Sequence, residues 1–206
     1  MTTETARAAA RRTLSSSGKL GVWLFLLTEV MLFGGLFILY AAYRTRYLPD
    51  FHRGGQELDA VIGVVNTVVL LTSSLTMAMS LTALGRRQKI LALCLLGATV
   101  LLGAAFLTNK GFEWSAKIHH GIYPSSPALL ARPRGEVLFF GLYFTMTGLH
   151  GLHVLAGMAV LTVMGLLVAR GHIHAADSVK LSNAGLYWHL VDVIWIFLLP
   201  LFYLAA

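Results

Sequence analysis

Charged residues are scarce along this chain, and cysteine is nearly absent. Only 12% of its 206 residues are Asp, Glu, Lys or Arg, whereas 57% are hydrophobic. Soluble globular domains carry about 25% charged and roughly 45–50% apolar residues. The single cysteine, Cys94, excludes an internal disulfide framework, and its place in an apolar run predicts a buried structural thiol. These shortages exclude a soluble domain and indicate a protein of the lipid bilayer.

Recognisable catalytic and metal motifs are missing as well. The sequence holds no nucleophile paired with a base, no phosphate-binding loop and no dinucleotide fingerprint. No apolar run has the two histidines, about a dozen residues apart, that a two-haem bundle needs. The doublet His119-His120 falls in an expected loop without further ligands. We therefore expect no catalytic residue, haem, copper or other metal in this chain.

Five apolar runs are each long enough to cross a hydrocarbon core of about 30 Å as a helix. They cover Leu20–Tyr43, Ala60–Leu84, Ile90–Thr108, Val137–Ala169 and Leu181–Ala206. The sequence thus predicts an all-α fold, a polytopic transmembrane bundle of five helices over residues 20–206, preceded by a basic N-terminal tail over residues 1–19. Three prolines between residues 109 and 136 predict an ordered loop there, because proline interrupts a helix.

The net charge of +7 comes from basic residues at the ends of the apolar runs rather than from one stripe. This distribution fits anionic lipid headgroups better than nucleic acid. The basic residues are densest in the N-terminal tail and in the short segments after the second and fourth runs. The positive-inside rule therefore predicts that the N-terminus is cytoplasmic and the C-terminus lies outside.

Ionisable groups inside the runs need a partner or a role, because lipid solvates them poorly. Glu29 lies well inside the first run, which favours a neutral, hydrogen-bonding carboxylic acid. Two interpretations of Glu29 stay open at this point. It can handle protons or contact lipid, or it can be a protonated acid bonded to a neighbouring helix.

Two further pairs of polar residues stand three apart and so share a helix face. His150 and His153 lie in the fourth run, and His189 and Asp192 lie in the fifth. An interaction between Asp192 and a histidine would offset the cost of both groups. In the second run, polar residues at intervals of seven predict a packing face, made of Asn66, Ser73 and Ser80.

Four stretches resemble subunit III of the haem-copper terminal oxidases, the cytochrome c oxidase subunit III family. The first contains Trp23 and Glu29, and the second is the acid-aromatic motif that ends in Glu113 and Trp114. The other two are the most specific, namely Thr147-Gly148-Leu149-His150-Gly151-Leu152-His153 and Tyr187-Trp188-His189-Leu190-Val191-Asp192-Val193-Ile194-Trp195. The resemblance runs from about Gly21 to Tyr203.

The resemblance implies a non-catalytic subunit of a bacterial cell (inner) membrane, in the shorter form that lacks the family's first two helices. Its partners would be the catalytic subunit I and the electron-accepting subunit II, which would hold the haem and copper. It would also bind phospholipid in a cleft between helices and support proton uptake or oxygen access. The buried polar residues of that scaffold would be Glu29, His150, His153, His189 and Asp192. Ser182 stands where the family often has a glutamate, which leaves open any acid-dependent contact there.

Other functions remain compatible with the same residues. A quinol oxidase subunit III, or the related small membrane protein associated with nitric oxide reductases, would share these motifs. A free-standing proton-coupled carrier that uses Glu29 and Asp192 is an alternative of a different class.

Overall fold

The computed structural model describes residues 3–175 and 177–204, and the side chains of these residues from Leu20 onward. In chain order the helices are α1 (Thr3–Arg46), α2 (Leu48–Gln56), α3 (Ala60–Gly85), α4 (Lys89–His119), α5 (Pro127–Leu130), α6 (Arg134–Ala169) and α7 (Val179–Leu199), followed by a π-helical turn, η1 (Pro200–Leu204). Five segments are long and apolar enough to cross a membrane: the apolar part of α1, then α3, α4, α6, and α7 with η1. The predicted all-α transmembrane bundle is confirmed.

Several span ends differ from the prediction by two or three residues, and two differences are larger. The third span does not end at Thr108, because α4 continues to His119. His119 is therefore the last residue of a helix rather than part of a loop, and both histidines of the doublet are exposed. The basic N-terminal tail is helical from Thr3 and continuous with the first span.

The prediction for Cys94 was wrong. Its side chain is exposed on α4, whereas Ala92 and Leu96, two positions away on either side, are buried. An apolar run in a membrane helix contains both core-facing and lipid-facing positions, so hydrophobicity alone does not indicate burial in the protein.

Local sequence fixes several helix ends. The side chain of Asp59 accepts hydrogen bonds from the backbone N–H groups of Val61 (2.8 Å) and Ile62 (3.3 Å), which caps α3. Ser126 caps α5 in the same way through Leu129 N–H, at 3.1 Å. At the other end of the chain, α7 gives way to η1 at Pro200, which has no N–H to continue the α-helical ladder.

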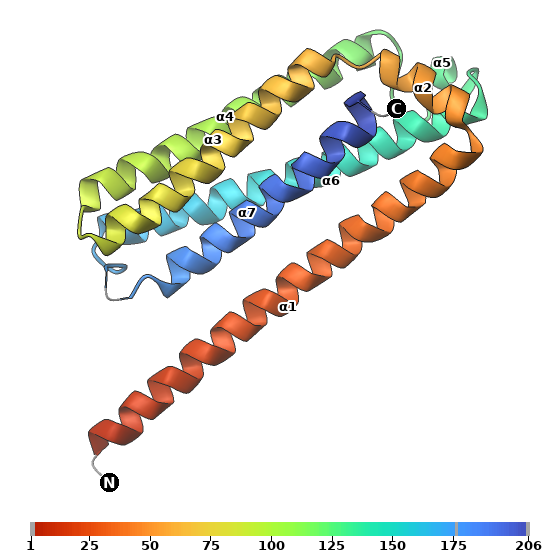
Figure 1. Cartoon of the computed structure of the whole chain (residues 1–206). Helices are drawn as coiled ribbons and strands as arrows, with labels where there is room; N and C mark the ends of the chain where they lie inside the picture. Colours follow the sequence, from red (N-terminus) through yellow and green to blue (C-terminus); the bar gives the residue numbers. More distant parts are fainter. Residues whose placement is uncertain (1–2, 176, 205–206) are drawn as a thin grey trace.

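The core of the bundle consists of α3, α4, α6 and α7, in which α3 and α6 each pack against both α4 and α7. In Figure 1, α1 lies apart from the bundle towards its N-terminus and joins it near α2. The buried side chains of its apolar part, Leu26, Phe33 and Tyr40, recur every seven residues and so form one face. The α3–α4 and α6–α7 connections lie at one end, and α2, α5 and the C-terminus lie at the other (Figure 1).

Trp188 lies where three neighbouring helices meet α7. It is fully buried, and its indole N–H donates to the Ser73 hydroxyl of α3 at 3.0 Å. Gly103 of α4 and Gly157 of α6 pack against its ring so closely that a Cβ on either glycine would lie 2.8 Å from a ring carbon. The predicted packing face of α3 is confirmed, since Asn66, Ser73 and Ser80 are all fully buried.

Ion pairs hold α2 against the start of α6. Arg53 binds Asp50 and also Glu136, with Nε 3.0 Å from Oε1 of the glutamate. Arg132 binds Glu57 at 2.5 Å and Glu136 at 3.5 Å. The four interactions form one network rather than isolated surface pairs, so they stabilise the arrangement of α2 and α6 at this end of the bundle.

Candidate functional site

Glu29 of α1 and His153 of α6 form a direct pair across two helices. The His153 Nε2 atom lies 2.7 Å from Glu29 Oε2, and His153 Nδ1 lies 2.7 Å from the carbonyl oxygen of Leu149. A carbonyl only accepts hydrogen bonds, so Nδ1 carries a hydrogen. One further proton must then lie between Nε2 and the carboxyl group. It is shared either as neutral histidine with carboxylic acid or as imidazolium with carboxylate.

The pair lies at the contact between α1 and the bundle. Glu29 falls between Leu26 and Phe33 on the buried face of α1, and the Phe33 ring meets the His153 ring edge-on at 5.4 Å. The two side chains stay partly accessible, at 14% for Glu29 and 15% for His153. Glu29 therefore finds its basic partner on α6 rather than on its own helix. Both side chains of the pair remain partly accessible from outside the bundle.

An apolar groove opens one helical turn from this pair, between α1, α6 and α7. Its volume is about 470 Å³. Phe25 lines it four residues before Glu29, and Tyr187 lines it while donating its hydroxyl to the His153 carbonyl at 3.2 Å. Lys180 and Asn183 are its polar lining residues. The groove thus combines apolar walls with a cationic group near the α6–α7 end.

His150 and His153 have different surroundings although they stand three apart. His150 is fully buried between the rings of Phe106 and Trp195, with centroid distances of 5.5 and 5.2 Å. Neither of its ring nitrogens has a hydrogen-bond partner among the described residues. Three residues turn a helix by about 300°, which directs His153 towards α1 and His150 into the core.

The prediction that Asp192 binds a histidine was wrong for the described part of the chain. Asp192 is only 3% exposed, and neither carboxyl oxygen has a hydrogen-bond partner there. His189 instead places Nδ1 2.6 Å from the Ser74 hydroxyl oxygen on α3. Spacing along α7 put His189 and Asp192 on one side of the helix, but α3 supplied a closer partner for the histidine.

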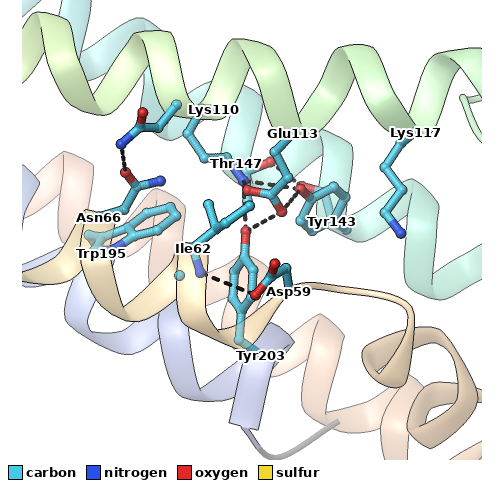
Figure 2. Close-up of polar contacts among 12 residues, drawn as sticks. Asp59, Ile62, Asn66, Lys110, Glu113, Lys117, Tyr143, Thr147, Trp195 and Tyr203 are labelled. Carbon is cyan, nitrogen blue, oxygen red and sulfur yellow. Dashed lines mark hydrogen bonds and ion pairs between the residues drawn. The ribbon is translucent and has the colours of Figure 1, made fainter.

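A buried network around Lys110 was not predicted from the sequence (Figure 2). Lys110 Nζ lies 3.0 Å from Glu113 Oε2, 3.0 Å from the Tyr143 hydroxyl and 2.8 Å from the Tyr203 hydroxyl. Both tyrosine hydroxyls also lie 2.6 Å from Glu113 Oε1. The four residues come from α4, α6 and η1, so the network joins three elements in the interior of the bundle.

Each donor in this network has an acceptor. A protonated lysine has three N–H donors, and three acceptors lie within reach. The two tyrosine hydroxyls each donate to Glu113, which as a carboxylate only accepts. The network therefore holds one positive and one negative charge with no free donor, which is typical of a structural link rather than a proton relay.

The sequence carried one signal of this network. Lys110 and Glu113 stand three apart in an apolar stretch, a spacing that forms ion pairs on helices. Glu113 had been singled out only for its motif with Trp114. Trp114 itself is half-buried, and its six-membered ring would lie 2.9 Å from a Cβ on Gly148. Within residues 3–175 and 177–204, no three His, Cys, Asp or Glu side chains gather as a metal site would require.

The Lys110–Glu113 pair generates a stability prediction. Lys110→Met and Glu113→Gln should each lower the stability of the protein by about 3–5 kcal/mol, because each leaves the partner charge buried and unpaired. The double variant should lose less than the sum of the two. Heat-induced unfolding of the purified variants in one detergent measures these differences. Single variants as stable as the parent would contradict the closed network.

Comparisons with known proteins agree with the motifs. The family model described as "Cytochrome c oxidase subunit III" matches residues 2–206. Cytochrome c oxidase subunit 3 of Bacillus sp. (strain PS3) is 32% identical over 100% of this chain and 96% of the relative. Cytochrome bo(3) ubiquinol oxidase subunit 3 of Pseudomonas aeruginosa is also 32% identical, over 90% of this chain and 84% of the relative.

A third relative is a larger protein. The haem-copper oxidase subunit I+III of Aeropyrum pernix is 26% identical over 89% of this chain, which corresponds to 22% of the relative. The family match covers nearly the whole chain, and the four matching motifs lie on four of the five spans of the bundle, α1, α4, α6 and α7. The chain belongs to the cytochrome c oxidase subunit III family.

Proposed function

We propose that this protein is a non-catalytic core subunit of a haem-copper terminal oxidase, which binds phospholipid beside the Glu29–His153 pair and supports proton uptake by the catalytic subunit. The observation that carries the proposal is the partly accessible, proton-sharing pair next to an apolar groove. Family membership supports the oxidase context.

The partners in this proposal are the catalytic subunit I, the electron-accepting subunit II and membrane lipid. A relative in which subunits I and III form one chain supports the pairing with subunit I. Haem and copper would lie in the partners, since His150, His153 and His189 contact aromatic rings or side chains of neighbouring helices. Relatives of both the cytochrome c and the quinol type match equally well, so the electron donor is a property of the other subunits.

A phospholipid fits the groove for physical reasons. Its acyl chains would occupy the apolar walls made by α1, α6 and α7, and its phosphate would reach Lys180. In this position the lipid covers the open side of the Glu29–His153 pair. The shared proton would then exchange slowly with water, and the local structure would hold during turnover.

The orientation in the membrane follows from the positions of the basic segments. We place the N-terminus and the α3–α4 connection in the cytoplasm and the α4–α5 connection outside. The two connections lie at opposite ends of the bundle (Figure 1). The connection with Arg86, Arg87 and Lys89 is the shorter and more basic of the two, which satisfies the positive-inside rule.

The oxidase assignment predicts the composition of the purified complex. Purification through a tag on this chain in a mild detergent should yield haem-bearing partner chains, measured by a haem spectrum and by identification of the co-purifying proteins. A free-standing proton-coupled carrier would instead purify alone, stable and without haem. That result would overturn the proposed function.

The pair predicts a difference between assembly and sustained turnover. Glu29→Gln keeps hydrogen bonding but removes the shared proton, and Glu29→Ala removes both. Both variants should assemble and then lose oxygen consumption progressively during turnover, which an oxygen electrode records over many cycles. The matched control is Thr28→Val, an exposed neighbour whose hydroxyl donates only to its own helix. Steady oxygen consumption by the Gln variant, equal to the parent, would leave Glu29 as a packing residue.

The orientation predicts a labelling pattern. In a Cys94→Ser background, which removes the exposed native thiol, a cysteine at Ser125 should react with an impermeant reagent in intact cells, and a cysteine at Gln88 should not. After cell disruption both should react. The reverse pattern in intact cells would refute the orientation.

A further inference from the structure

Exposed hydroxyl groups on the membrane helices are satisfied by their own backbone. Thr28, Thr72, Thr82, Thr108 and Thr162 are all exposed, and each donates to a carbonyl three or four residues earlier at 2.6 to 3.2 Å. A hydroxyl bonded in this way can face hydrocarbon, because its only donor is satisfied. These threonines therefore require no partner protein.

The polar group formed by Ser74, His189 and Asp192 is different. Ser74 and His189 are half-buried and bind each other across α3 and α7 at 2.6 Å. No partner for His189 Nε2 occurs among the described residues. Asp192 lies one turn further along α7, next to the Ser74 side chain. Neither of its buried carboxyl oxygens has a hydrogen bond of normal geometry among the described residues. Unlike the threonines, this group has hydrogen-bonding atoms without a partner inside a membrane span.

The positions of the protons indicate what is missing. A carboxyl group buried without a cation is favoured as the neutral acid. Asp192 can then donate its proton to Ser74 Oγ, and Ser74 can donate its own to His189 Nδ1. The single hydrogen of the neutral imidazole lies on Nε2 in this arrangement, and that N–H has no acceptor among the described residues. It requires a hydrogen-bond acceptor from outside the part of the chain that the structure describes.

Lipid cannot supply this acceptor. His189 lies ten residues after Val179 and fifteen before Leu204, the ends of its span. At ~1.5 Å per residue these separations are roughly 15 and 22 Å, so His189 lies in the hydrocarbon region, away from headgroups. The hydrocarbon part of an acyl chain has no acceptor atom. An acceptor at this depth has to come from another membrane-spanning protein.

Apolar side chains surround this group and complete a surface suited to a helix. Leu71 of α3 is 49% exposed, and Val193 and Ile196 of α7 are 45% and 41% exposed. On α7, His189, Val193 and Ile196 follow helical spacing and so share one face. A central polar contact within an apolar surface is typical of helix association in membranes.

We propose that this α3–α7 face, made of Leu71, Ser74, His189, Val193 and Ile196, is the surface on which a transmembrane helix of the haem-bearing catalytic subunit docks, with a side-chain acceptor of that helix bound to the N–H at His189 Nε2. The proposal rests on the proposed function, because it assumes that the catalytic subunit is the partner. It assigns a surface and a polar anchor to that association.

Site-specific photo-crosslinking tests the surface in the intact complex. A photoreactive phenylalanine replaces Leu71, one helical turn from Ser74 on α3, or Val193, one turn from His189 on α7. The matched control is Leu101 of α4, which is 71% exposed and lies at the surface between α4 and α6. Crosslinks to the haem-bearing subunit are expected from Leu71 and Val193 and not from Leu101. If the complex co-purifies but only Leu101 crosslinks, or Leu71 and Val193 react with lipid alone, this proposal is wrong. If no haem-bearing chain co-purifies with the parent protein, the proposed function itself fails.

Substitution of the anchor tests the hydrogen bond separately. His189→Phe should reduce retention of the haem-bearing subunit at rising detergent concentration by about tenfold, the size expected for one buried hydrogen bond. His189→Gln keeps an N–H donor near the Nε2 position and should restore most of the retention, whereas Thr72→Val, a self-bonded site on α3, should change nothing. Equal retention by His189→Phe and the parent would rule out the anchor.

Discussion

Inside a bilayer, polar groups have to find their hydrogen bonds within protein, because hydrocarbon offers none. The Lys110–Glu113 network meets this constraint most completely. Two opposite charges and two tyrosine hydroxyls satisfy one another with no donor left over. Because they come from α4, α6 and η1, the same contacts fix the C-terminal turn against the bundle. Helix α4 can therefore remain buried and helical through a lysine that would otherwise mark its end.

The other polar groups are less completely hydrogen-bonded. This difference distinguishes groups that only stabilise the fold from groups with a proposed functional role. The Glu29–His153 pair is bonded but shares a proton and stays partly accessible, next to an apolar groove. Ser74 and His189 leave a valence open at a half-buried face. A network in which every donor has an acceptor stabilises the fold. A proton-sharing pair that is partly accessible can respond to its surroundings. A hydrogen-bonding atom without a partner indicates a contact with another protein. The five-helix scaffold thus holds three kinds of polar contact with three different uses.

The position of α1 has a physical cause and a consequence. Its buried residues recur every seven positions, so only a narrow stripe of the helix touches α6 and α7. Glu29 lies in that stripe and bonds to α6, which adds a polar link to an otherwise apolar contact. The divergence of α1 from the bundle accompanies the groove beside this link (Figure 1). A loosely packed helix and an accessible acid are therefore two aspects of one arrangement.

Sequence alone determined the five spans and the all-α class, because about 20 consecutive apolar residues have few other solutions in lipid. It also identified the packing face of α3 and Glu29 as a buried acid in need of a partner. Tertiary structure decided the rest. Spacing could not show that His150 and His153 face different neighbours, that Ser74 rather than Asp192 binds His189, or that Cys94 faces outward. The hydrophobic pattern also ended the third span at Thr108, eleven residues before the end of α4. It could not show that Lys110 pairs with Glu113 and hydrogen-bonds to tyrosines on α6 and η1. Helical periodicity gives the side of a helix on which a residue lies, but only the packing of helices distant in sequence determines what that side meets.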